Sequence, residues 1–184
     1  MQSKEYTIIK KSDWNITNWS GGTTSQLFIY PLDSNFKTGD YQLRISIATV
    51  EVETSTFTTL KDVNRTLLVL DGNLMLDHEN QHTSNLKQYD QDSFSGNWNT
   101  SSIGKVRDFN VMTKGDTHSE VRVINVSKET MFAGLQNDFI HVLKGNLTID
   151  GQIIGLNDSV QLSSKSMNLN LSLESRIVLV RTAY

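Results

Sequence analysis

The sequence predicts an all-β protein, an antiparallel sandwich or barrel, in a chain of 184 residues. Three observations lead to this prediction. Short segments rich in β-branched and apolar residues recur along the chain, and turn motifs made of Asn, Asp and Gly separate them. No segment of about ten or more residues shows the apolar periodicity of an amphipathic helix. Many short strands with frequent turns are typical of antiparallel sandwiches and barrels.

The clearest strand is expected over residues 42–50, where apolar and polar residues alternate. Leu43, Ile45 and Ile47 fall on one face of this strand, and Arg44, Ser46 and Ala48 fall on the other. Further strand segments are expected at 66–76, 121–126, 139–149 and 176–180. Asp71-Gly72-Asn73 interrupts the first of these segments and Lys144-Gly145-Asn146 interrupts the third, and we expect both to be hairpin turns.

An internal repeat organises these strands. Residues 68–76 align with 141–149, and Val, Leu, Gly, Asn and Leu coincide in the two segments. Residues 92–94 resemble 158–160 at a shorter offset, so the first copy is expected to hold about seven extra residues within 77–90. The repeat predicts two copies of one β-module, a first domain at 1–116 and a second at 117–184.

Composition excludes several classes of protein. The chain has no cysteine, which excludes a disulfide scaffold, an iron–sulfur protein and a cysteine nucleophile. The formal net charge of −3 argues against a nucleic-acid partner, because such binding depends on clustered Lys and Arg. No apolar run is long enough for a membrane span, and the N-terminus lacks the apolar core of a signal peptide. We therefore expect a cytoplasmic protein with no membrane partner.

The repeat resembles the cupin module, a small double-stranded β-barrel of the jelly-roll type. In metal-binding cupins, a glutamate ligand precedes the glycine of the repeated turn at a fixed spacing. Counting back from Gly72 and Gly145 places Arg65 and Asp138 at that position. The resemblance thus implies a bicupin whose first copy has a fixed positive charge in place of a metal ligand, and whose second copy is structural.

The histidines do not follow the cupin metal motif. Neither copy has the His-x-His pair of that motif, and the four histidines are His78, His82, His118 and His141. A metal site needs imidazoles that converge from neighbouring strands. We expect these four not to converge, and we predict no metal and no cofactor.

Five segments, in this order, resemble the HutD/Ves family of bicupins. They are Trp19–Leu27, Arg44–Ala48, Phe57-Thr58 with Arg65, Phe94, and Gly104–Thr113. The chain departs from the family pattern in having Gln26 where glutamate is usual and in lacking the Pro-Gly turn before Arg65. The resemblance implies a small-ligand binding protein or regulator connected with histidine utilisation or with a stress response. The implied ligand is a small carboxylate of the urocanate or N-formylglutamate class.

The expected binding site lies in the first copy. Arg44 and Arg65 would bind the carboxylate, while Thr24, Gln26 and Ser46 would fix its orientation. Asp108 and Asn110 share a strand face, and we expect them to bind the ligand or to orient the arginines. The alternative for both is a structural turn. For Arg44 and Ser46 the alternative is the solvent face of an edge strand. For Arg65 it is a surface ion pair.

Two other functions stay open. One is a cupin-type isomerase or lyase that uses Asp108 or His141 as its acid–base group. The other is a protein-interaction module whose barrels are filled with side chains. We assign no catalytic residue, and we leave open whether the chain forms a homodimer.

Overall fold

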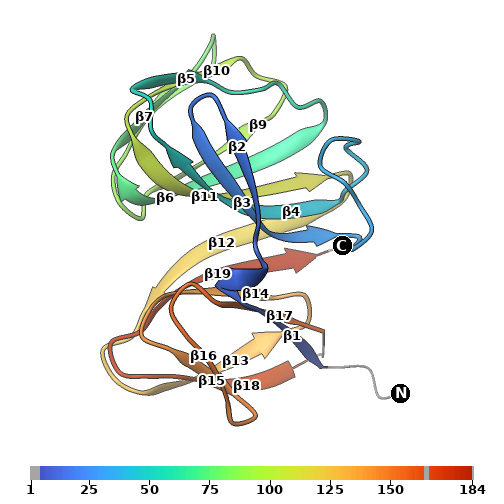
Figure 1. Cartoon of the computed structure of the whole chain (residues 1–184), viewed down its shortest axis with the longest axis vertical. Helices are drawn as coiled ribbons and strands as arrows, with labels where there is room; N and C mark the ends of the chain where they lie inside the picture. Colours follow the sequence, from blue (N-terminus) through green and yellow to red (C-terminus); the bar gives the residue numbers. More distant parts are fainter. Residues whose placement is uncertain (1–4, 164–165, 184) are drawn as a thin grey trace. The chain divides into compact units, whose positions relative to one another are not determined.

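A computed structural model describes residues 5–163 and 166–183 (Figure 1). Within these residues every regular element is a strand, apart from one 3-10 helix at Lys11–Asp13. The all-β prediction is therefore confirmed. No helix in the described ranges is long and apolar enough to cross a membrane.

The chain divides into two compact units. The N-terminal unit, Asn15–Thr117, contains β2 (Asn15–Trp19), β3 (Gly22–Tyr30), β4 (Leu43–Val50), β5 (Thr54–Thr56), β6 (Val63–Gly72), β7 (Leu74–His78), β8 (His82–Leu86), β9 (Gln91–Ser95), β10 (Thr100–Ile103) and β11 (Val106–Lys114). The C-terminal unit contains β1 (Tyr6–Ile9), η1 (Lys11–Asp13), β12 (His118–Asn125), β13 (Thr130–Leu135), β14 (Phe139–Lys144), β15 (Leu147–Ile149), β16 (Gln152–Ile154), β17 (Ser159–Leu162), β18 (Ser166–Leu171) and β19 (Arg176–Ala183).

The boundary between the units falls at 117/118, one residue after the expected 116/117, and the start of the chain is grouped differently. Residues 5–14 group with the C-terminal unit, because β1 pairs antiparallel with β17. The described part of the chain before Asn15 thus adds an edge strand to the far half of the sequence.

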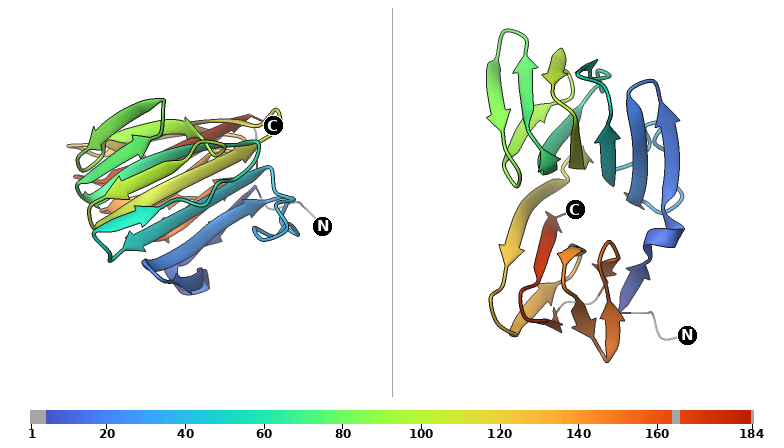
Figure 2. Two further views of the ribbon diagram at one scale, coloured as in Figure 1. Left: turned by 90° about the horizontal axis from the view of Figure 1, so that it is seen from above. Right: turned by 60° about the vertical axis from the view of Figure 1, so that its left-hand side comes forward.

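Each unit consists of two sheets, and the two units share one strand order apart from β2 and β3 at one edge of the first unit and β1 at the other edge of the second. In the N-terminal unit the larger sheet runs β2-β3-β4-β11-β6-β9 and the smaller runs β5-β10-β7-β8. In the C-terminal unit the larger sheet runs β12-β19-β14-β17-β1 and the smaller runs β13-β18-β15-β16. Figure 2 shows the strands of the N-terminal unit's larger sheet side by side.

The two repeated glycine motifs lie at equivalent places in this order. Gly72 links β6 to β7 and Gly145 links β14 to β15, and both have positive φ, +89° and +71°. A Cβ atom on Gly72 would lie 2.6 Å from the Lys105 carbonyl oxygen, so only glycine fits there. The hairpin prediction is wrong, however, because β6 and β7 belong to different sheets. The motifs turn the chain from one sheet to the other.

The match expected between residues 92–94 and 158–160 is displaced by two residues in the structure. Val69 exchanges backbone hydrogen bonds with Tyr89 and Asp90, and Val142 exchanges the same bonds with Asn157 and Asp158. Asp90, not Asp92, is therefore the structural counterpart of Asp158. The spacing between the two motifs then differs by about five residues instead of seven.

Candidate functional site

The alternating residues of β4 meet a matching set on β11 at the centre of the larger N-terminal sheet. Arg44 lies opposite Met112, and Ser46 lies opposite Asn110. Directly opposed residues of an antiparallel pair project from the same face of the sheet. Because β4 lies between β3 and β11, the edge-strand alternative for Arg44 and Ser46 is wrong.

Arg65 joins this face from β6, where it lies opposite Met112. The resulting arginine cluster consists of Gln26, Arg44, Ser46, Arg65, Asp108 and Asn110. All of these side chains are buried except that of Gln26, which is half-buried. The surface-pair alternative for Arg65 is therefore wrong as well. Thr24 lies two residues from Gln26 and opposite Ala48, and the described contacts include none between Thr24 and the cluster.

Apolar side chains separate the cluster from solvent on two sides. On β6, Arg65 alternates with Val63 and Leu67, which belong to two different core clusters. On β11, Asp108 and Asn110 lie between Val106 of one core cluster and Met112 of the other. The cluster is thus a polar layer inside the N-terminal unit.

Arg44 is held by neutral groups. Its Nε donates a hydrogen bond to Gln26 Oε1 at 2.9 Å, and its Nη1 donates to Ser46 Oγ at 3.3 Å. Its guanidinium lies 4.0 Å from the centre of the Phe36 ring, within the range of a cation–π contact. Burial lowers the pKa of Arg44, but no carboxylate among the described residues forms an ion pair with it.

Arg65 forms fewer and longer hydrogen bonds to side-chain oxygens than Arg44. Its Nη2 donates to Asn110 Oδ1 at 3.4 Å, and its guanidinium lies 4.7 Å and 5.1 Å from the ring centres of Phe57 and Phe94. Its Nε is buried and has no hydrogen-bond partner within the described ranges. Burial lowers the pKa of Arg65 to about 10, so it still carries its charge at neutral pH. A buried N–H without an acceptor costs free energy, and a ligand oxygen would remove that cost.

Asp108 carries the one carboxyl group of the cluster. It lies in the middle of β11, so the structural-turn alternative for Asp108 and Asn110 is wrong. Burial raises the pKa of Asp108 to about 7, and the charge of Arg65 and a hydrogen bond from Asn110 Nδ2 offset part of that rise. At neutral pH the two arginines are therefore at most partly balanced by Asp108.

Residues that the sequence analysis did not place in the site complete its surroundings. Tyr41 O–H donates to Met112 Sδ at 3.8 Å, and burial raises the pKa of this phenol, so it stays neutral. Phe36 covers Arg44 from the segment between β3 and β4. Met112 could have been predicted from the sequence, since it continues the alternation of Asp108 and Asn110. Phe36 and Tyr41 lie outside the strands, so no periodic pattern indicates their positions.

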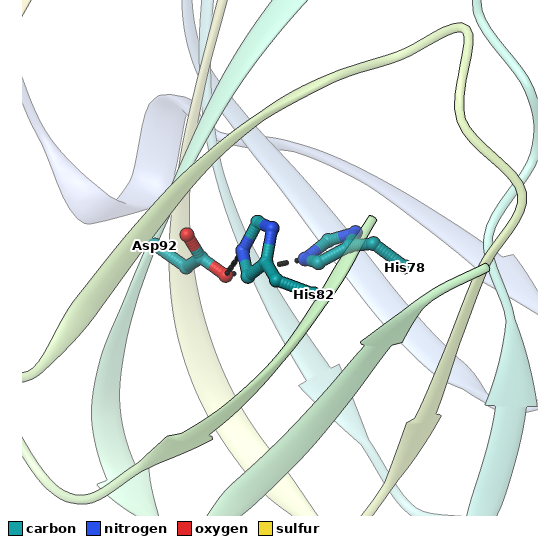
Figure 3. Close-up of side chains that lie close together, drawn as sticks. All are labelled: His78, His82 and Asp92. Carbon is teal, nitrogen blue, oxygen red and sulfur yellow. Dashed lines mark hydrogen bonds and ion pairs between the residues drawn. The ribbon is translucent and has the colours of Figure 1, made fainter. Parts of the chain in front are cut away.

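The expectation that the histidines do not converge is wrong for two of them. His78 and His82 lie directly opposite each other on β7 and β8. Their Nε2 atoms lie 3.2 Å and 3.0 Å from the same oxygen, Asp92 Oδ2 (Figure 3). The hairpin register brings the pair together although the residues are four apart in the sequence.

The C-terminal unit contains the acid–base candidate His141 and also Asp138, the residue expected at the second ligand position. His141, on β14, is buried, and its Nδ1 lies 2.9 Å from Ser159 Oγ. Asp138 accepts two hydrogen bonds from Arg181, both at 2.9 Å, and one from the Leu135 N–H. The carboxylate at the second ligand position is therefore fully engaged within its own unit.

Comparison with known proteins identifies the fold class and the family of the chain. The fold is cupin-like: the structure is similar to a cupin 2 conserved barrel domain protein from Leptotrichia buccalis, with a TM-score of 0.59 and 14% identity over 91% of each chain. A model of the HutD family matches residues 10–179, and the chain belongs to that family.

Two solved structures resemble it over nearly their whole length. A conserved protein of unknown function from Pseudomonas aeruginosa PAO1 has a TM-score of 0.84 and 18% identity, covering 98% of this chain and 100% of that one. HutD from Pseudomonas fluorescens SBW25 has a TM-score of 0.77 and 18% identity, covering 97% and 98%. No curated protein matches the chain.

Proposed function

We propose that the protein binds one small carboxylate at the arginine cluster, without a metal ion. The observation that carries the proposal is the unbalanced positive charge of Arg44 and Arg65, whose described hydrogen-bond acceptors are all neutral. Two buried guanidiniums favour an anion, and a carboxylate matches their planar arrangement of donors.

The surroundings favour an anion with a small organic body. Phe57 and Phe94 flank Arg65, and Phe36 covers Arg44, so rings lie beside both charges. Urocanate and N-formylglutamate combine a carboxylate with a group that such rings would contact. The relative from P. fluorescens was determined in a formate condition, and formate is the smallest carboxylate.

The wider role that follows is a binding or regulatory protein connected with histidine utilisation or a stress response. We further propose that the shared strand order of the two units reflects an internal duplication, as in a bicupin. In this proposal the N-terminal unit holds the ligand and the C-terminal unit is structural. A cytoplasmic location and the absence of nucleic-acid and membrane partners stay predictions.

One observation favours an isomerase or lyase as a second candidate. The pKa of Asp108 is raised to about 7 beside Arg65, which suits a general acid or base at neutral pH. Turnover of a bound carboxylate that stops in Asp108→Asn while binding persists would favour this candidate over simple binding.

The test is ligand-induced thermal stabilisation. Wild type and Arg65→Met are melted with urocanate, N-formylglutamate and formate, with Arg122→Ala as a control because Arg122 is an exposed arginine of the other unit. We expect wild type and the control to gain melting temperature with at least one carboxylate. Arg65→Met should lose about tenfold to a hundredfold in affinity, since charge-assisted bonds contribute about 1.5–3 kcal/mol. The absence of any shift across the panel would exclude the proposal.

A further inference from the structure

Three side chains of the N-terminal unit bring their ligand atoms together outside the arginine cluster. We call His78, His82 and Asp92 the His–Asp cluster; one ligand atom from each lies within 4.8 Å of the others. Asp92 Oδ2 lies 3.2 Å from His78 Nε2 and 3.0 Å from His82 Nε2 (Figure 3). In a tetrahedral site with bonds near 2.0–2.1 Å, neighbouring ligand atoms lie about 3.3 Å apart. The two separations are therefore close to those that such a site requires.

The fold holds the three residues on three consecutive strands. His78 and His82 are opposed on the hairpin of β7 and β8, in the smaller sheet. Asp92 is on β9, the edge strand of the larger sheet. One ion bound by all three would link the edges of the two sheets.

The His78 ring is oriented by a second hydrogen bond. Its Nδ1 lies 2.8 Å from Oγ1 of the buried Thr100, on β10. This contact directs the opposite nitrogen, Nε2, toward Asp92. Metal-binding histidines are commonly oriented in this way by a polar group on their other ring nitrogen.

The cluster is closed on one side and open on the other. The His78 ring lies 4.4 Å from the Phe94 ring and 5.6 Å from the Trp98 ring, centre to centre. The His78 side chain is buried, whereas the side chain of His82 is 41% exposed. An ion can therefore reach the ligands from solvent, and water can occupy a fourth position.

We propose that the His–Asp cluster binds one divalent transition-metal ion, with zinc as the reference ion. Two imidazoles and one carboxylate are a ligand set that zinc and other late first-row ions accept, with one position left to water. Each neutral imidazole binds the metal through an unprotonated Nε2 and carries its one ring proton on Nδ1, which at His78 donates to Thr100 Oγ1. Asp92 binds as the ionised carboxylate. The site is separate from Arg65, which occupies the glutamate-ligand position of metal-binding cupins.

Calorimetric titration of the metal-free full chain with Zn²⁺ tests the proposal. The compared variants are His82→Ala, Asp92→Asn and the control His118→Ala, which removes an exposed histidine outside the cluster. We expect one Zn²⁺ per chain for wild type and for the control. Each cluster variant should bind at least about tenfold more weakly.

Cobalt absorption gives a second readout that does not depend on stability. Co²⁺ bound by wild type should show the intense visible bands of a four-coordinate ion, and His82→Ala should lose them. Because His82 is half exposed and Asp92→Asn keeps the side-chain shape, both variants are expected to fold, and circular dichroism checks this. Absence of Zn²⁺ binding by wild type, or equal loss in His82→Ala and His118→Ala, would overturn the proposal.

Discussion

The two units share most of their strand order but differ in the side chains at equivalent positions of their larger sheets. Leu67 and Ile140 are equivalent in the repeat, and their cross-strand neighbours differ. Leu67 lies between Asp92 and Asn110, both polar, on the larger N-terminal sheet. Ile140 lies between Val160 and Leu179, both buried and apolar.

The residues two positions before Leu67 and Ile140 are charged in both units, but their contacts differ. Arg65 and its repeat counterpart Asp138 are both buried. Asp138 is bound through both oxygens by Arg181, so the C-terminal unit satisfies this charge internally. Arg65 contacts Asn110 and two aromatic rings and has no ion pair within the described ranges. The C-terminal unit thus pairs its buried charge internally, whereas the N-terminal unit leaves the buried charge of Arg65 without an ion pair among the described residues.

The largest loss of unfolding free energy is expected when a carboxyl group is introduced into the apolar interior of the C-terminal unit. Ile177 lies opposite Val142, as Asp108 lies opposite Val69. Ile177→Asp would bury a carboxyl group without a partner, and we expect it to cost about 4 kcal/mol or more of unfolding free energy. Urea unfolding measures this, with Ile177→Val as the control at about 1 kcal/mol. Equal costs for both variants would show that the C-terminal interior tolerates charge.

A smaller effect separates Asp138 from Arg65. Asp138→Ala removes both bonds from Arg181 and the bond from the Leu135 N–H, so we expect a loss of about 2–3 kcal/mol in unfolding free energy. Arg65→Met keeps an aliphatic side chain beside the two rings and should cost less than about 1 kcal/mol. The same urea assay compares them, and a larger loss in Arg65→Met would contradict the comparison.

Stability should depend on pH through Asp108. Because burial raises the folded-state pKa of Asp108 to about 7, the folded protein holds a proton that the unfolded chain has released above about pH 4. This group therefore lowers stability as pH rises from about 4 to 7, by at most about 1.4 kcal/mol per pH unit. Unfolding of wild type and Asp108→Asn across this range measures the slope. An unchanged slope in the variant would exclude Asp108 as its source.

The smallest expected effect is a change in Zn²⁺ affinity when the group that orients the His78 ring is removed. Thr100→Val removes the hydroxyl that contacts His78 Nδ1 and should weaken Zn²⁺ binding about tenfold. The control is Thr182→Val in the C-terminal unit, which changes a buried threonine whose Oγ1 has no hydrogen-bond partner among the described residues. This variant should leave the affinity for Zn²⁺ unchanged. Equal effects in the calorimetric titration would assign the loss to general stability.

Local patterns in the sequence were sufficient for the all-β fold class and for the positions of some residues of the candidate site. Alternation correctly placed Arg44 and Ser46 on one face of a strand, and the spacing from Gly72 located Arg65. The contributions of Phe36 and Tyr41 were not predictable, because both lie in an irregular segment with no periodicity. His78 and His82 were misjudged because their contact depends on hairpin register and on Asp92 from another sheet. The Gly72 motif has a turn signature, but only long-range pairing decides which strands it connects.

Calorimetric titration of the wild-type chain with N-formylglutamate and with urocanate, at pH 6, counts the carboxylates bound per chain. We expect one carboxylate per chain, bound in the N-terminal unit and lost in Arg65→Met but not in Asp138→Ala. Two carboxylates per chain, or none, would contradict this expectation.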